Sequence, residues 1–283
     1  MLKPPASLPF MSRQKSIIVG AVAYDPKVVT IWEIIKKYFG DSGVPLDYVL
    51  YSNYESLVEA LVQRHIHIAW NSPLAWVRTQ MLTKGACKAL AMRDTDQNLT
   101  SKIYTRIDTG IQTLADLKGK TLALGAIDSP QASILPLHYL SKQGIDIQKD
   151  IKILRFNWMV GKHGDHIGGE EEALKAVQRG EADAGAMLDL NWIRFANEGK
   201  LDTTRLKILA STEPFDHCNF TALEDFDPEL EKQWTETLFK MDYNNPEHRY
   251  MMDLEGLKEW RPARTHLYKN LTEAVREQKL YED

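Results

Sequence analysis

LADLKGKTLALGAIDSPQASILP, residues 114–136, is the stretch that predicts the fold of this 283-residue chain. Its first part predicts a short helix over 114–117 and a tight turn at 118–120, where a glycine stands between two lysines. The apolar run 121–125 predicts a buried strand, and a short loop over 126–129 leads from it into a helix. A strand that continues through a loop into a helix is the repeating unit of α/β domains.

The helix after this loop begins with two residues that suit a helix start. Ser129 fits the N-cap position because its hydroxyl can accept a hydrogen bond from a free backbone N–H. Pro130 fits the first helical position, where its missing N–H costs nothing. A helix start at the carboxyl end of a strand directs unpaired N–H groups into a crevice, which favours a small anionic ligand. On this stretch alone, an ordinary strand–helix unit of an α/β domain without a ligand is the favoured interpretation.

Composition restricts the class of protein. Hydrophobic residues make up 43% and charged residues 26% of the chain, as in a soluble globular protein with one large domain or two modest lobes. The formal net charge of −4 gives no indication of a nucleic-acid or anionic-membrane partner. Cys87 and Cys218 are too few for a disulfide framework or a four-cysteine zinc site. No apolar run approaches the roughly 18 residues of a membrane span, so no membrane insertion is predicted.

The first 16 residues, MLKPPASLPFMSRQKS, are polar and contain prolines. They lack the apolar core of a secretory signal, so the sequence as it stands predicts a cytoplasmic chain or one whose leader has been lost. Residues 1–13 are predicted to form a flexible tail.

Short apolar runs alternate with helical patterns along the rest of the chain, and this rhythm predicts βαβ units and largely parallel sheets. The predicted strands cover residues 16–22, 46–51, 66–70, 88–92, 101–106, 121–125, 151–156, 182–187 and 206–210. The predicted helices cover residues 28–39, 54–63, 74–82, the segment from 130 on, 170–179, 190–197, 227–240, 246–255 and 267–280.

Four stretches carry a family resemblance that extends from about residue 16 to 262. They are residues 54–73 (YESLVEALVQRHIHIAWNSP), 101–136, 171–189 (EEALKAVQRGEADAGAMLD) and 211–220 (STEPFDHCNF). In this order they resemble segments of the phosphate/phosphite/phosphonate-type substrate-binding proteins of ABC transporters. The motif LADLKGK alone is shared by many type II periplasmic binding proteins, so the resemblance is more specific for the fold than for the ligand.

The resemblance implies an α/β, type II periplasmic-binding-protein-like fold with two lobes, each a mostly parallel sheet flanked by helices. Lobe one would comprise residues 14–104 and 215–283, and lobe two residues 105–214. Two crossover strands would join the lobes, near 102–106 and 212–220, and a ligand would lie in the cleft between them.

The same resemblance implies a function. The chain would capture a small polar solute, phosphonate-like, zwitterionic or an oxyanion, for uptake by an ABC permease. It would act outside the cytoplasm, most simply as a monomer, with no cofactor and no chemistry of its own. The alternative is a cytoplasmic enzyme or ligand sensor that reuses the fold, since fold does not determine function.

Most candidate ligand contacts lie on loops that follow predicted strands. They are Tyr24, Tyr54, Trp70, Asn71, Ser72, Ser129, Gln131, His163, His166, Asp189, His217 and Cys218. Trp70 equally fits the core, whereas for Tyr24 ligand binding is slightly favoured over an ordinary turn. Where the family has Ser-Thr-Ser at the helix start, this chain has Ser-Pro-Gln, so only the hydroxyl of Ser129 remains. Asp189 is a candidate partner for an ammonium group.

The loop WMVGKHGDHIGG, residues 158–169, offers an alternative metal site. His163, His166 and Glu170 carry the imidazole and carboxylate groups that metals bind. A polar surface loop explains the same composition, because His-x-x-His in a glycine-rich loop has low specificity.

His217 and Cys218 bring a thiol beside an imidazole, which is the composition of a nucleophile and its base. Adjacent residues of an extended strand point to opposite faces, so we predict that these two do not pair. Arg93 fits either a cleft contact for an anion or, more simply, a solvated loop charge. Aspartates at 25, 128 and 189 argue against a highly anionic ligand and favour a zwitterion, or a cation that carries an acidic group.

Overall fold

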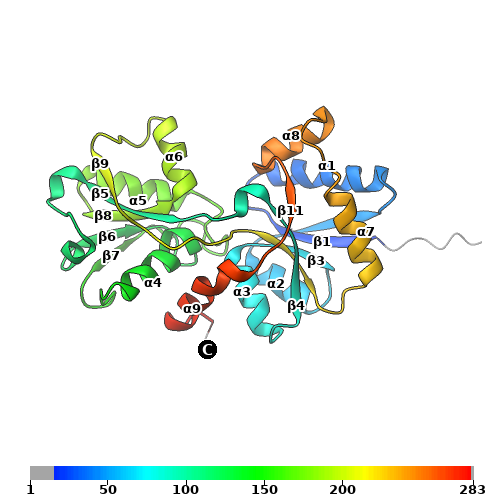
Figure 1. Cartoon of the computed structure of the whole chain (residues 1–283), viewed down its shortest axis with the longest axis horizontal. Helices are drawn as coiled ribbons and strands as arrows, with labels where there is room; N and C mark the ends of the chain where they lie inside the picture. Colours follow the sequence, from blue (N-terminus) through cyan, green and yellow to red (C-terminus); the bar gives the residue numbers. More distant parts are fainter. Residues whose placement is uncertain (1–15, 282–283) are drawn as a thin grey trace, which may run out of the picture.

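The computed structural model describes residues 16–281, so the predicted flexible tail, residues 1–13, lies outside the described residues. Two lobes lie side by side along the long axis of the molecule (Figure 1), and each is built on one sheet. Among residues 16–281, no helix combines the length and the apolar character needed to cross a bilayer.

The first sheet has six strands in the order β11-β4-β10-β3-β1-β2. Its strands are β1 (Ile17–Val22), β2 (Leu46–Tyr51), β3 (Ile68–Asn71), β4 (Cys87–Arg93), β10 (Asn219–Leu223) and β11 (Trp260–Pro262). Its helices are α1 (Lys27–Asp41), α2 (Tyr54–Val62), α3 (Pro73–Leu82), α7 (Pro228–Leu238) and α8 (Pro246–Glu255). Apolar side chains of β1, β3 and β10 pack against α1, α7 and α8, with Phe220 and Trp234 at the centre of this core.

The second sheet has five strands in the order β7-β6-β8-β5-β9. Its strands are β5 (Ser101–Arg106), β6 (Thr121–Leu124), β7 (Lys152–Arg155), β8 (Ala184–Leu188) and β9 (Leu206–Ser211). Its helices are α4 (Leu135–Lys142), α5 (Gly168–Arg179) and α6 (Asp189–Asn197). One core forms on each face of this sheet, because a strand buried on both faces places alternate side chains in each.

Both sheets are mixed, and the antiparallel strands include those that arrive from the other lobe. Strands β1 to β4 run in one direction, whereas β10 and β11 run against them. In the second sheet β5 alone runs against its neighbours. A chain that crosses between the lobes enters the next sheet at the cleft, where the parallel strands end, and therefore runs antiparallel to them. The sheets are thus mixed, whereas the sequence pattern predicted largely parallel ones.

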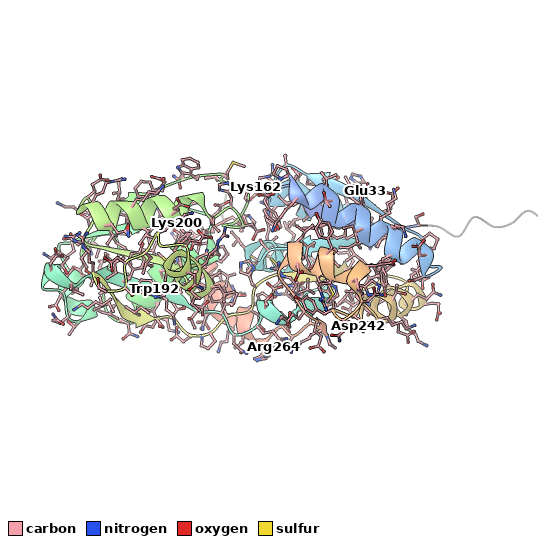
Figure 2. All side chains as sticks on the ribbon, turned by 90° about the horizontal axis from the view of Figure 1, so that it is seen from above. Glu33, Lys162, Trp192, Lys200, Asp242 and Arg264 are labelled. Carbon is pink, nitrogen blue, oxygen red and sulfur yellow. The ribbon has the colours of Figure 1, made fainter. Side chains whose placement is uncertain are left out.

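The crossing segments meet at Leu99 and Phe215, which exchange backbone hydrogen bonds of 2.9 and 2.8 Å. The first crossing therefore precedes β5, whereas the sequence placed it near residues 102–106. Since β5 lies wholly in the second sheet, the predicted lobe boundary at 104–105 falls inside a strand. Buried Asp216 ties the crossings together, because it accepts from the backbone N of Asn98 at 3.1 Å. It also pairs with Arg264, which Figure 2 labels at the junction of the two lobes.

Helix α9 (Lys269–Glu277) contacts both lobes at the end of the described chain. It packs against α3 of the first lobe and α4 of the second, and Figure 1 shows it in red below the crossing segments. The amide Nε2 of Gln278 donates to the carbonyl of Ile134 at 2.9 Å, and the Glu277 carboxylate bonds to His138.

Candidate ligand-binding site

A cavity of about 180 Å³ lies between the lobes, with walls from both. The first lobe contributes Tyr24, Lys27, Trp70, Arg93, His217, Cys218 and Glu255. The second lobe contributes Gln131, Gly164, Asp165, Ile167, Leu188 and Asn191. Several of these residues end or directly follow strands, as expected for a ligand site of an open α/β sheet. A larger hollow of about 1020 Å³ lies at α3 and α9 on the first lobe alone, away from the cleft.

A buried ion-pair network forms one wall of the cavity. The Arg93 guanidinium donates to both oxygens of Asp96 at 2.7 Å and to Glu255, whose backbone carbonyl accepts at 2.8 Å. It also lies 5.3 Å from the ring centre of Trp70. Burial alone would raise the pKa of Asp96, but the guanidinium outweighs it and lowers that pKa to about 2. Arg93 is therefore a buried, paired charge, neither a solvated loop residue nor an unpaired contact for an anion.

Two further carboxyl groups line the cavity, Asp165 and Glu255. Burial raises the pKa of each, because few polar groups replace the lost water. The negative charge of Asp165 adds to the rise at Glu255. The hydroxyl of Tyr54 donates to Asp165 and orients it.

The thiol of Cys218 lies 3.1 Å from Nδ1 of His217, so the predicted divergence of these side chains is wrong. Both residues precede β10, in a stretch without regular strand geometry, and the alternation of an extended strand does not apply there. Burial raises the pKa of the Cys218 thiol, and the charges of Asp165 and Asp96 raise it further. This pair is therefore a neutral thiol beside an imidazole, and burial opposes formation of a thiolate nucleophile.

The loop 157–167 of the second lobe docks onto the first lobe. Nζ of Lys162 donates to the carbonyls of Ala23 and Ser52 at 2.5 Å each, at the carboxyl ends of β1 and β2. Figure 2 labels Lys162 between the two lobes. The carbonyl of Gly161 accepts from the backbone N of Tyr54 at 2.9 Å. The two lobes are therefore held together by backbone and side-chain bonds of this loop.

His163 is fully buried at the same contact. Its Nδ1 lies 2.6 Å from the Ser72 hydroxyl, its Nε2 lies 3.1 Å from Glu55, and its ring stacks on Tyr54. The backbone of His163 has a φ of +49°, and Met159 also has a positive φ. Non-glycine residues adopt this region at a cost, so the docked contacts must compensate for it.

Five of the predicted contacts line the cavity: Tyr24, Trp70, Gln131, His217 and Cys218. The remaining seven lie outside its lining and serve other contacts. Tyr54, Ser72 and His163 form the interlobe contact just described. Ser129 caps the helix start as predicted and accepts from the backbone N of Ala132 at 3.1 Å.

Asn71, Asp189 and His166 also have partners within the protein. Asn71 is fully buried and donates to the Thr221 hydroxyl at 2.9 Å. Asp189 accepts from the backbone N and the hydroxyl of Thr100 at 2.9 and 2.8 Å, which holds the chain where it enters β5. The ring of His166 stacks on Trp158.

The predicted metal site of His163, His166 and Glu170 does not form. Glu170 accepts from Leu188 N and Asn191 within the second lobe, whereas the His163 ring contacts Ser72 and Glu55 of the first lobe. Within residues 16–281, the group of metal-binding side chains that does converge is Asp96, His217 and Cys218. Both oxygens of Asp96 already bind the Arg93 guanidinium, which would repel a cation placed there.

Sequence reasoning missed the charged part of the cavity: Lys27, Asp165 and Glu255, and the pairing of Arg93. Glu255 ends α8, far along the chain from β4, and no local pattern links it to Arg93. Asp165 lies in sequence between His163 and His166, whose side chains dominate the pattern of this loop. Its signal was its place in a glycine-bearing loop after β7, where the fold puts cleft residues.

The chain matches a known family model over most of its length. The model describes the periplasmic substrate-binding protein of phosphonate ABC transporters, and it matches residues 21–268. A probable phosphite-binding protein of an ABC transporter from Prochlorococcus marinus is 22% identical, over 95% of this chain and 92% of the relative. An uncharacterized Haemophilus influenzae protein is 74% identical over 34 residues, which are 12% of this chain and 48% of that protein.

Solved structures show the same fold. The Prochlorococcus marinus protein in complex with methylphosphonate has a TM-score of 0.70 at 20% identity, covering 94% of this chain and 98% of that one. A Xanthomonas citri protein bound to ATP has a TM-score of 0.74 at 15% identity, covering 95% and 100%.

Proposed function

This chain belongs to the family of periplasmic substrate-binding proteins of phosphonate ABC transporters, and from this we propose that it captures a small polar solute between its lobes. The solute would be handed to an ABC permease, which fits the family. We also propose that the protein acts outside the cytoplasmic membrane and that it acts as a monomer.

One observation carries the proposal: the cavity lies between two lobes that close on each other through loop 157–167. A solute held there contacts both lobes, so it stabilises the closed arrangement over the open one. Charges of both signs line the cavity: Lys27 and Arg93 are basic, and Asp165 and Glu255 are acidic. This lining supports a zwitterionic solute over a simple oxyanion.

The test is thermal unfolding of the full chain against phosphate, phosphite, phosphonates, amino acids, quaternary amines and divalent metals. A compound at about 100 times its dissociation constant adds about 2.7 kcal/mol to the free energy of unfolding, and the melting temperature rises. We expect one class of small polar compounds to produce this rise.

A variant locates the binding. Ile167→Trp fills the cavity and should abolish the rise, whereas Ile153→Trp, on the exposed side of β7, should leave it intact. Solute capture would be contradicted if no compound changes the melting temperature of the wild type and extracts of the purified protein contain no small molecule.

A further inference from the structure

The helix start that follows β6 is covered by the protein itself. The Asp128 carboxylate, one residue before the N-cap, accepts from the backbone N of Gly161 at 2.5 Å. Gly164 packs so closely on Ser129 that a Cβ at position 164 would lie 2.3 Å from the Ser129 hydroxyl oxygen. A helix start favours binding of an oxyanion, but this one is already occupied by the Asp128 carboxylate and by loop 157–167.

The cations of the cavity wall already have partners. The Arg93 guanidinium donates two hydrogen bonds to the Asp96 carboxylate and two to Glu255, one to its backbone carbonyl and one to its carboxylate. Nζ of Lys27 donates to the carbonyl of Leu254 at 2.8 Å. A new anion would have to compete with these bonds for its donors.

Acceptors, in contrast, remain available. One oxygen of Asp165 accepts from Tyr54, and the carboxylate forms no other hydrogen bond within residues 16–281. Oε1 of Gln131 is buried without a partner, while its Nε2 donates to Gly164 O at 3.0 Å and fixes the amide. Oε1 of Glu255 accepts from Arg93 at 3.4 Å, whereas its Oε2 forms no hydrogen bond within residues 16–281, and the residue lines the same cavity. Buried acceptors without donors are costly, so a ligand that brings donors is favoured.

Resting on the proposed function, we infer that the solute carries a protonated nitrogen with N–H groups, an ammonium or amidinium, that donates to Asp165, Gln131 and Glu255. Asp165 and Gln131 come from the second lobe and Glu255 from the first, so one cationic group bridges the lobes. The rest of the solute, polar or acidic, lies toward His217, whose Nε2 is buried without a partner.

Matched pairs of compounds test the inference by calorimetry on the full chain. The probes are aminomethylphosphonate against methylphosphonate, glycine against acetate, and glycine against its trimethylated form, which keeps the charge and loses the N–H groups. We expect the amine with N–H groups to bind at least tenfold more tightly in each pair. Aminomethylphosphonate should also bind more weakly as the pH falls and Asp165 and Glu255 become protonated.

Asp165→Asn is the decisive variant, because it keeps the shape and can still accept from Tyr54. It should weaken binding of the amine-bearing probe at least tenfold and flatten the pH dependence. Glu171→Gln removes a second-lobe carboxylate that pairs with Lys175 and Lys200, and should change neither.

Different results would overturn the cationic group and solute capture. Equal binding of methylphosphonate and aminomethylphosphonate, or unchanged binding in Asp165→Asn, would overturn the cationic group and leave solute capture intact. If no amine-bearing probe binds, the cationic group is also overturned, and mass spectrometry of co-purified small molecules then decides on solute capture alone.

Discussion

Arg93 and Asp96 show at the scale of single residues how one buried pair shapes the site. The side chain of Asp96 is 2% exposed and that of Arg93 16%, so water replaces little of the lost solvation of either charge. Each is tolerated because the other is present. The pair also fixes Arg93 against Trp70, with the guanidinium 5.3 Å from the ring centre, so that both side chains line the cavity.

A pH dependence of stability follows from this pair. The pKa of Asp96 is lowered to about 2 in the folded chain. Its contribution, about 2 kcal/mol, is therefore present above the ordinary carboxyl pKa and lost as pH falls through the folded value. Denaturant unfolding between pH 5 and 2 should show this loss. Asp96→Asn should lower stability at pH 7 by about 3 kcal/mol, because it leaves the Arg93 charge uncompensated, and should remove part of the acid decline.

Asp108→Asn is the control, since Asp108 is largely exposed and its ion pair with Arg106 contributes less than about 1 kcal/mol. If the free energy of unfolding of the wild type and of Asp96→Asn falls equally as the pH is lowered, Asp96 is not the group responsible for the acid dependence.

At the scale of a single element, loop 157–167 has two roles: it closes the cavity, and it covers the helix start that follows β6. Its conformation requires glycine at two positions, Gly161 with φ +90° and Gly164 with φ +83°. At Gly164 there is no room for a side chain, because a Cβ would also lie 2.6 Å from Nε2 of Gln131.

Gly164→Ala should therefore undock the loop. Hydrogen exchange provides the measurement, because the amide of Tyr54 donates to the loop carbonyl of Gly161 and should exchange at least tenfold faster in the variant. Gly119→Ala is a matched control: Gly119 has φ +80° but nothing within 4 Å of the added Cβ, so it carries only the backbone strain of about 1 kcal/mol. Equal protection of Tyr54 in both variants would show that the loop tolerates the added methyl group.

At the scale of the whole molecule, the lobes meet at loop 157–167, at the crossing segments and at α9. Figure 2 labels Lys162 at one edge of the junction between the lobes and Arg264, which pairs with Asp216 of the second crossing, at the other. Opening at the loop can therefore leave the crossings joined. Lys162 is nine-tenths buried, and burial lowers its pKa. Its two carbonyl partners belong to the other lobe.

Lys162→Met should favour the open arrangement, because the carbonyls of Ala23 and Ser52 lose their donor and gain water only when the lobes separate. Small-angle X-ray scattering should show a larger radius of gyration for the variant than for the wild type. Lys200→Met, on the outer surface of the second lobe (Figure 2), removes the same charge and should leave the scattering unchanged. Identical curves for all three chains would mean that Lys162 does not hold the lobes.

Much of this protein was determined by local sequence. The alternation of apolar runs and helical patterns predicted most elements within a few residues, since burial periodicity and caps such as Ser129 are local properties. The motifs from 101 to 136 predicted the two-lobed fold, and the family model confirms the family. Trp70, Gln131 and His217 were placed near the cavity because the fold brings strand ends together.

Only the tertiary structure decided how the site is charged and closed. Glu255 reaches Arg93 across 162 residues, and Lys162 reaches Ala23 across 139, and no periodicity encodes such pairs. The partners of His163, Ser72 and Glu55, are 91 and 108 residues away in sequence, so local sequence could not show that this histidine forms an interlobe contact instead of binding a metal. Which polar groups are paired depends on long-range packing, because each buried donor or acceptor takes the partner that the folded chain places beside it.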